Sequence, residues 1–160
     1  MTKRTYSRLE LAENQLRSAI VLFIQGGDRF SVITLAGAAD VIFAQLVIRA
    51  GKKNFTEISL VDRAAAGAPP QSREEYGQAM NDVLFINQLK HMDKGDDGFL
   101  ELDPEESALG AILKTLVNYA ILEGKSAPLV LAFRAFMVQS LDPRKYNVHC
   151  EPDWNPDDKT

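Results

Sequence analysis

The chain has 160 residues, of which 46% are apolar and 25% are charged, and its formal net charge is −4. This length and composition fit one globular domain with a core of its own. The acidic balance argues against non-specific wrapping of nucleic acid, which needs a basic stripe to neutralise phosphates. The single cysteine, Cys150, excludes an internal disulfide and fits a reducing cytoplasm, where we expect the protein. No run approaches 18 apolar residues, so we expect no membrane span and no membrane partner.

Apolar residues spaced by three and four predict two long helices in the first third of the chain. The first follows a capping-box pattern from Ser7 to Glu10 and ends at Gly26, and the second covers residues 31–50. Residues 36–39 of the second helix are all small, which lets a neighbour approach closely, so we place this helix at the centre of the fold. The short connection between the two helices predicts antiparallel neighbours.

Residues 52–62 fit either a short helix or a strand. The spacing of Phe55, Ile58 and Val61 suits a helical turn, whereas residues 58–60 alternate in the manner of a strand. We favour the helix. The following residues, 63–71, are rich in alanine, glycine and proline and predict a loop.

Three further helices are predicted in the second half of the chain. A capping-box pattern at residues 72–75 starts one that runs to about Met92. Asp103 and Pro104 start the next, which ends before Gly124, and the last covers residues 127–141. The sequence therefore predicts an all-α, antiparallel bundle of about five helices in a domain of residues 1–143. Residues 144–160 are expected to form a C-terminal tail.

The loop of residues 93–104 partly matches a calcium-binding EF-hand. Asp93, Asp97 and Gly98 stand at the first, fifth and sixth positions of that pattern. Gly95 offers no side chain at the third position, and Pro104 replaces the glutamate that binds calcium through two oxygens. We therefore expect an acidic loop without a metal. No other pattern predicts a metal or a cofactor.

Asn87, Lys90 and His91 form the most informative polar cluster. If the helix runs to about Met92, Asn87 and His91 continue an apolar stripe that starts at Met80. Polar groups on an apolar face need partners, which indicates a site at a helix–helix or subunit interface. Alternatively, Lys90 and His91 stabilise the negative end of the helix dipole and pair with nearby aspartates in the loop. Both interpretations stay open at this point.

Three features resemble the HEPN superfamily of small helical-bundle proteins, over roughly residues 8–140. They are the small-residue helix around residues 35–40, the motif Asn87-x-x-Lys90-His91, and the acidic loop leading to residues 103–106. The resemblance implies a homodimer. Many members are metal-independent ribonucleases, often toxins paired with an antitoxin, and others are inactive modules for binding or dimerisation. Their signature is an arginine and a polar residue ahead of a histidine, with two copies meeting across a dimer interface.

On that signature, His91 falls on the histidine, Asn87 on the polar residue and Ile86 on the arginine. A histidine moves the proton of a 2′-hydroxyl and an arginine stabilises charge on the phosphate. Isoleucine cannot stabilise charge on a phosphate, and Lys90 lacks the guanidinium with which an arginine donates two hydrogen bonds at once. Asp40 falls near an acidic position that some members carry on the neighbouring helix.

These residues lead us to expect a non-enzymatic dimerising module that binds a cognate protein or RNA. Asp40, Asn87, Lys90 and His91 are the candidate interface or binding residues. One alternative is a degenerate, metal-independent ribonuclease of toxin–antitoxin type, with His91, Asn87 and Lys90 as its catalytic candidates. Another is a structural or regulatory protein with no nucleic-acid role.

Overall fold

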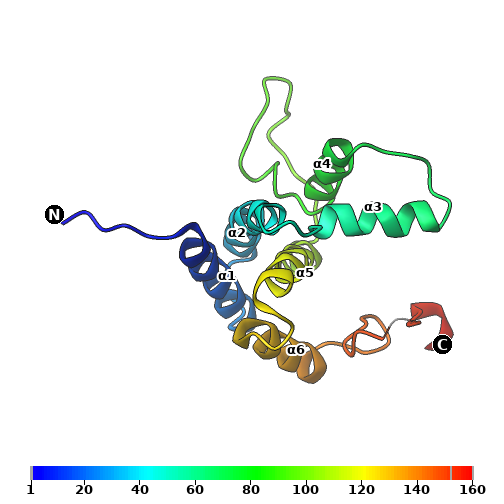
Figure 1. Cartoon of the computed structure of the whole chain (residues 1–160). Helices are drawn as coiled ribbons and strands as arrows, with labels where there is room; N and C mark the ends of the chain where they lie inside the picture. The colour runs from blue at the N-terminus through cyan, green and yellow to red at the C-terminus, as the bar shows by residue number, and fades with distance from the viewer. Residues whose placement is uncertain (1, 152, 160) are drawn as a thin grey trace.

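The computed structural model describes residues 2–151 and 153–159 (Figure 1). Over these residues the chain is helical and contains no strand, which confirms the all-α class. Six α-helices are present, where about five were expected, and a short 3₁₀ helix follows them. The elements are α1 (Arg8–Ile24), α2 (Arg29–Arg49), α3 (Phe55–Ala65), α4 (Arg73–Val83), α5 (Pro104–Glu123), α6 (Pro128–Ser140) and η1 (Pro156–Lys159).

Residues 52–62, which fit two patterns, contain the start of a helix because Asn54 caps it. The Asn54 side chain accepts a hydrogen bond from the Glu57 backbone N–H at 3.1 Å, and the Glu57 carboxylate accepts from the Asn54 N–H at 3.0 Å. This reciprocal capping satisfies two backbone donors that a helix start leaves free. The same arrangement, between Ser72 and Glu75, starts α4 as predicted.

The core lies between α2 and its two neighbours. Helix α2 packs extensively against α1 on one side and α5 on the other, as predicted for the small-residue helix (Figure 1). Helix α6 closes the core, where Phe23, Phe133 and Phe136 pack ring against ring with centroids 5.7–6.0 Å apart. By length and composition alone, α2 is also apolar enough to cross a membrane. A central core helix has the same composition, and eight residues of α2 are buried in this bundle.

Helices α3 and α4, the helical hairpin, lie on one side of this bundle (Figure 1). Neither helix contributes a buried residue. The hairpin is anchored instead just after α4, where Leu84 and Ile86 are buried in the core. These two anchors enter against glycines of the central helices, Ile86 at Gly37 of α2 and Leu84 at Gly110 of α5.

Helix α4 ends at Val83, so the prediction that it runs to about Met92 is wrong. Residues two apart point in nearly opposite directions on a helix, so a continuous helix cannot bury both Leu84 and Ile86 in one core. The chain leaves the helix by placing Phe85 in the left-handed region, with φ of 57°. Burial of two apolar anchors therefore outweighs the helical pattern at this point.

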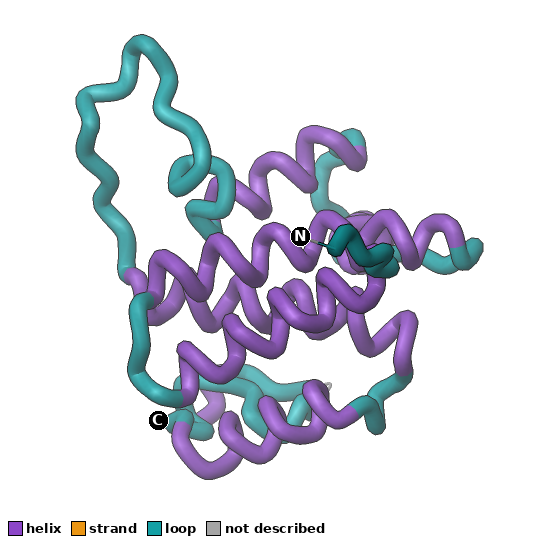
Figure 2. The backbone as a smooth tube through the Cα atoms, turned by 90° about the vertical axis from the view of Figure 1, so that its left-hand side faces the viewer, coloured by secondary structure: helices purple, strands orange, loops and turns teal. Residues whose placement is uncertain are grey.

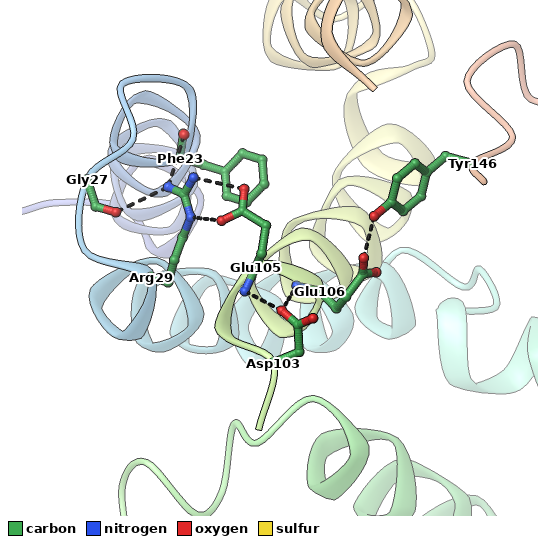
Figure 3. A network of polar contacts seen from close by, with 7 residues as sticks. All are labelled: Phe23, Gly27, Arg29, Asp103, Glu105, Glu106 and Tyr146. Carbon is green, nitrogen blue, oxygen red and sulfur yellow. Dashed lines mark hydrogen bonds and ion pairs between the residues drawn. The ribbon is translucent and has the colours of Figure 1, made fainter. Parts of the chain in front are cut away.

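A polar network ties the start of α5 to the loop between α1 and α2 (Figure 3). The guanidinium of Arg29 donates to the Glu105 carboxylate and to the backbone carbonyls of Phe23 and Gly27, at 3.0 and 3.1 Å. Asp103 caps the helix, as predicted, by accepting from the N–H groups of Glu105 and Glu106.

The start of the predicted tail packs against the same end of α5. Glu106 accepts hydrogen bonds from Lys145 and from the Tyr146 hydroxyl, and these bonds lower the pKa of Glu106. Val148 is buried in the core. The first residues after Arg144 therefore belong to the packed structure.

Residues 92–103, which we name the acidic loop, project from the bundle between the hairpin and α5. Both views show this loop standing clear of the helices (Figures 1 and 2). Asp96 and Asp97 hold its turn by accepting from the backbone N–H groups of Gly98 and Phe99, at 2.8 and 3.0 Å. The described residues contain no group of three or more His, Cys, Asp or Glu side chains able to hold a metal ion.

Candidate functional site

A buried ion pair joins the two central helices. Asp40 of α2 and Lys114 of α5 are both almost fully buried, and the lysine Nζ donates to one oxygen of the carboxylate. Asn118 stands one helical turn after Lys114, on the same face of α5. Its side-chain Nδ2 donates to the other oxygen of Asp40 at 2.8 Å. Both oxygens of the buried carboxylate are therefore satisfied, as burial of a charge requires.

The same cluster reaches both helices of the hairpin. Lys114 Nζ also donates to the Asn81 side chain of α4, at 3.0 Å. The Asn118 side-chain oxygen accepts from the backbone N–H of Phe55, at the start of α3, at 2.8 Å. We name Asp40, Asn81, Lys114 and Asn118 the central polar cluster. Because it touches α2, α3, α4 and α5, it serves as the joint between hairpin and bundle.

A cleft of about 360 Å³ opens beside the central polar cluster, and we name it the central cleft. Four helices, or the residues that cap them, line it: Asp40, Val41, Ala44, Gln45, Ile48, Asn54, Thr56, Arg73, Glu74, Gly77, Asn81 and Lys114. The lysine has three N–H donors and uses two of them on Asp40 and Asn81, which leaves one for the cleft. No histidine, cysteine or serine lines it. The central cleft thus offers hydrogen bonds and contains no nucleophile paired with a base.

Asn87 and His91 lie together, away from the central cleft. They line a second cleft of about 430 Å³ with Gln78, Asp82, Gln88, Asp93 and Asp96. Asn87 Nδ2 donates to the Asp82 carboxylate at 3.1 Å, and His91 is exposed. Among the described residues, His91 forms no ion pair with any of the three aspartates of that cleft. Lys90 is exposed beside them and does not line the cleft.

The predicted helical stripe from Met80 to His91 is wrong, because α4 ends at Val83. Asn87 and His91 therefore do not continue an apolar helix face, and they share no cleft with Asp40. The prediction that Lys90 and His91 stabilise the end of this helix fails for the same reason. Of the four candidates, Asp40 alone belongs to the buried cluster, and it is held by residues that the sequence pattern did not single out.

The missed residues are Asn81, Lys114 and Asn118. A signal for one of them exists in the sequence: Lys114 is a lone charge in the apolar half of α5, as Asp40 is within α2. Two opposite charges in two apolar helices suggest a buried pair, since an unpaired one is strongly unfavourable. The sequence alone does not show that Asp40 of α2 lies opposite Lys114 of α5, because 74 positions separate the two residues and only the packing of the helices aligns them.

Comparison with known proteins adds no relative to this picture. No family model, no curated protein and no solved structure matches the chain.

Proposed function

We propose that the protein is a HEPN-like helical module that acts without catalysis, as a homodimer that binds a cognate protein or RNA. The all-α bundle supports the fold part of this proposal. The sequence features that resemble the superfamily are the basis for the rest.

The observation that carries the non-enzymatic part is the place of Ile86. This residue occupies the position of the family arginine, and it is 3% exposed in the core, against Gly37. A guanidinium there would be buried among apolar groups, which is strongly unfavourable for a charge. No arginine lines the cleft that holds His91. The lining of this cleft therefore lacks the arginine that would stabilise charge on a phosphate.

The remaining acid–base groups support the same conclusion. Asp40 accepts from both Lys114 and Asn118, so its carboxylate is fully engaged in holding the fold. His91 is exposed, and the nearest charged residues in its cleft are acidic. Aspartates beside a histidine repel an RNA phosphate rather than bind it. The formal net charge of −4 likewise favours a protein partner over RNA.

A ribonuclease assay tests this proposal. Purified protein incubated with single-stranded RNA, with a metal chelator present, should leave the RNA intact, and His91→Ala should behave in the same way. Since His91 is exposed, this substitution should change the free energy of unfolding by less than about 0.5 kcal/mol. Cleavage by the wild type that disappears in His91→Ala, and persists in Lys145→Ala as a surface control, would establish the ribonuclease alternative instead.

A further inference from the structure

The acidic loop exposes large apolar side chains that this chain does not cover. Phe99 is 83% exposed, and Met92 and Leu100 are exposed beside it. The loop's own aspartates hold the turn that presents Phe99, since Asp97 accepts from its backbone N–H. An exposed apolar group of this kind on a projecting loop marks a contact with another molecule.

A groove on α1 and α2 has the complementary character. Its volume is about 220 Å³, and its lining is an apolar floor between two cations: Arg8, Val41, Ile42, Gln45, Leu46 and Arg49. Val41 is 60% exposed at the edge of this groove. We name it the basic groove. It is large enough to receive one large apolar side chain.

The charges of the loop and of the groove are opposite. Four carboxylates surround the exposed apolar residues of the loop, at Asp93, Asp96, Asp97 and Glu101, with Lys94 as the single cation among residues 92–101. None of these charges, and neither arginine of the groove, forms an ion pair with another described residue. Complementary potentials of this kind steer association and fix its register.

The loop and the groove lie toward opposite ends of α2. The loop leads into the first turn of α5, which binds Arg29 at the start of α2. The basic groove is formed by the second half of α2 together with the start of α1. The loop projects away from the bundle in both views rather than folding over its own helices (Figures 1 and 2).

This arrangement suits two copies related by a two-fold axis. If the α2 helices of two copies run antiparallel, the loop of each lies over the groove of the other. The contact is then self-complementary and closed, which is the usual symmetry of a homodimer. A second copy of the chain is thus an occupant with the required shape, charge and position.

We propose that the acidic loop of each copy inserts Phe99 into the basic groove of the other, with Leu100 packed at its edge and the loop carboxylates facing Arg8 and Arg49. This inference rests on the homodimer of the proposed function and names the surfaces that form it. Anchoring by a large aromatic in a pocket, surrounded by charges at the rim, is the common anatomy of such interfaces.

Sedimentation equilibrium of purified variants tests the apolar anchor. The double variant Phe99→Ser/Leu100→Ser should weaken dimerisation by about tenfold or more, because it removes the central contact. The matched control is Leu131→Ser/Val138→Ser on α6, whose side chains are 50% and 48% exposed and face neither surface. It should dimerise as the wild type does. All four residues are exposed, so circular dichroism should report unchanged helicity in both variants.

Charge exchange tests the pairing itself. Arg8→Glu/Arg49→Glu places like charges in the groove, and Asp93→Lys/Glu101→Lys reverses charges on the loop without touching the aspartates that hold its turn. Each variant alone should be largely monomeric. An equal mixture of the two should recover the dimer, because each loop then meets a groove of opposite charge. Salt at about 0.5 M should weaken the wild-type dimer by screening.

The outcomes separate this inference from the proposed function. A wild-type dimer that no loop or groove substitution weakens would show that another face dimerises, and would overturn the inference while leaving the homodimer in place. Failure of the mixture to recover the dimer would overturn the pairing of loop with groove. A wild type that stays monomeric at about 0.1 mM, a concentration at which even weak specific dimers form, would remove both proposals.

Discussion

Asp40 and Lys114 show how a single buried charge depends on its neighbours. Each is almost fully buried, and each is held by an asparagine as well as by the other. Removing one partner of such a pair leaves an uncompensated charge in the core, which is more unfavourable than removing both.

We predict a large coupling between these two residues. Lys114→Met and Asp40→Asn should each lower the free energy of unfolding by about 3–5 kcal/mol. The double variant should lose much less than the sum, since it leaves no buried charge. Urea unfolding followed by circular dichroism measures the free energy of unfolding of the wild type, the two single variants and the double variant, which together form a double-mutant cycle. The exposed pair of Asp142 and Arg144 is the control, where the single variants should leave stability unchanged. Additive losses at Asp40 and Lys114 would contradict this account.

Among the elements, the contact of α2 with the segment after α4 depends on a missing side chain. A Cβ atom at Gly37 would lie 2.6 Å from Cγ2 of Ile86, with Cγ1 and Cβ of the same residue close behind. A Cβ at Gly110 of α5 would lie 2.5 Å from Cδ2 of Leu84, and that atom is the end of a flexible side chain. The first clash involves a stiff, β-branched residue, and the second does not.

We therefore predict that two glycine-to-alanine substitutions differ in sign or size. Alanine in place of glycine within a helix normally stabilises by about 1 kcal/mol. At Gly110 much of that gain should remain, because Leu84 can rotate away. At Gly37 the clash should exceed it and destabilise the protein by about 1–3 kcal/mol, and Ile86→Leu in the same chain should restore part of the loss. Thermal unfolding of Gly37→Ala, Gly110→Ala and Gly37→Ala/Ile86→Leu measures these effects on stability. Equal effects at both glycines would show that Ile86 is not tightly held.

The elements were largely predictable from the sequence, and the exceptions have specific causes. Caps at Ser72 and Asp103 mark two helix starts where the structure has them. The short helix favoured for residues 52–62 is present as α3, although its start depends on the Asn54 cap, which apolar spacing does not reveal. The end of α4 was missed because Leu84 and Ile86 are anchored by glycines on two other helices, and local periodicity carries no information about them.

At the scale of the whole molecule, the hairpin and the bundle have different sources of stability. Helices α3 and α4 contribute no buried residue, whereas α2 and α5 supply eight and ten. The hairpin is joined to the bundle through the central polar cluster and the two anchors after α4. Segments with few buried apolar contacts open locally at lower free energy than the core.

Hydrogen exchange should show this difference directly. Amides of α3 and α4 are expected to exchange at least about tenfold faster than those of α2 and α5 under native conditions. In Lys114→Met the hairpin should exchange faster still, since its link to Asn81 is lost. Uniform protection across the six helices would mean that hairpin and bundle unfold as one unit.

The candidate site was only partly predictable. Asp40 was identified, whereas its partners lie on α4 and α5, beyond the reach of local pattern. Asn87 and His91 do lie near one another, as their spacing suggested, but around a turn rather than along a helix. The expected approach of Asn87 and His91 to Asp40 required α4 to continue to about Met92, and α4 ends at Val83 because Leu84 and Ile86 enter the core.

The ion pair of Asp40 and Lys114 also gives the contact between the two central helices its own response to temperature. Water solvates charges less favourably as temperature rises, so the penalty for burying this pair falls on warming, while apolar stabilisation per unit area levels off. The contact between α2 and α5 therefore contains one component that gains relative strength on warming, in a core that is otherwise apolar. The stability lost in the Lys114→Met/Asp40→Asn double variant should accordingly be larger when it is measured warm than when it is measured cold.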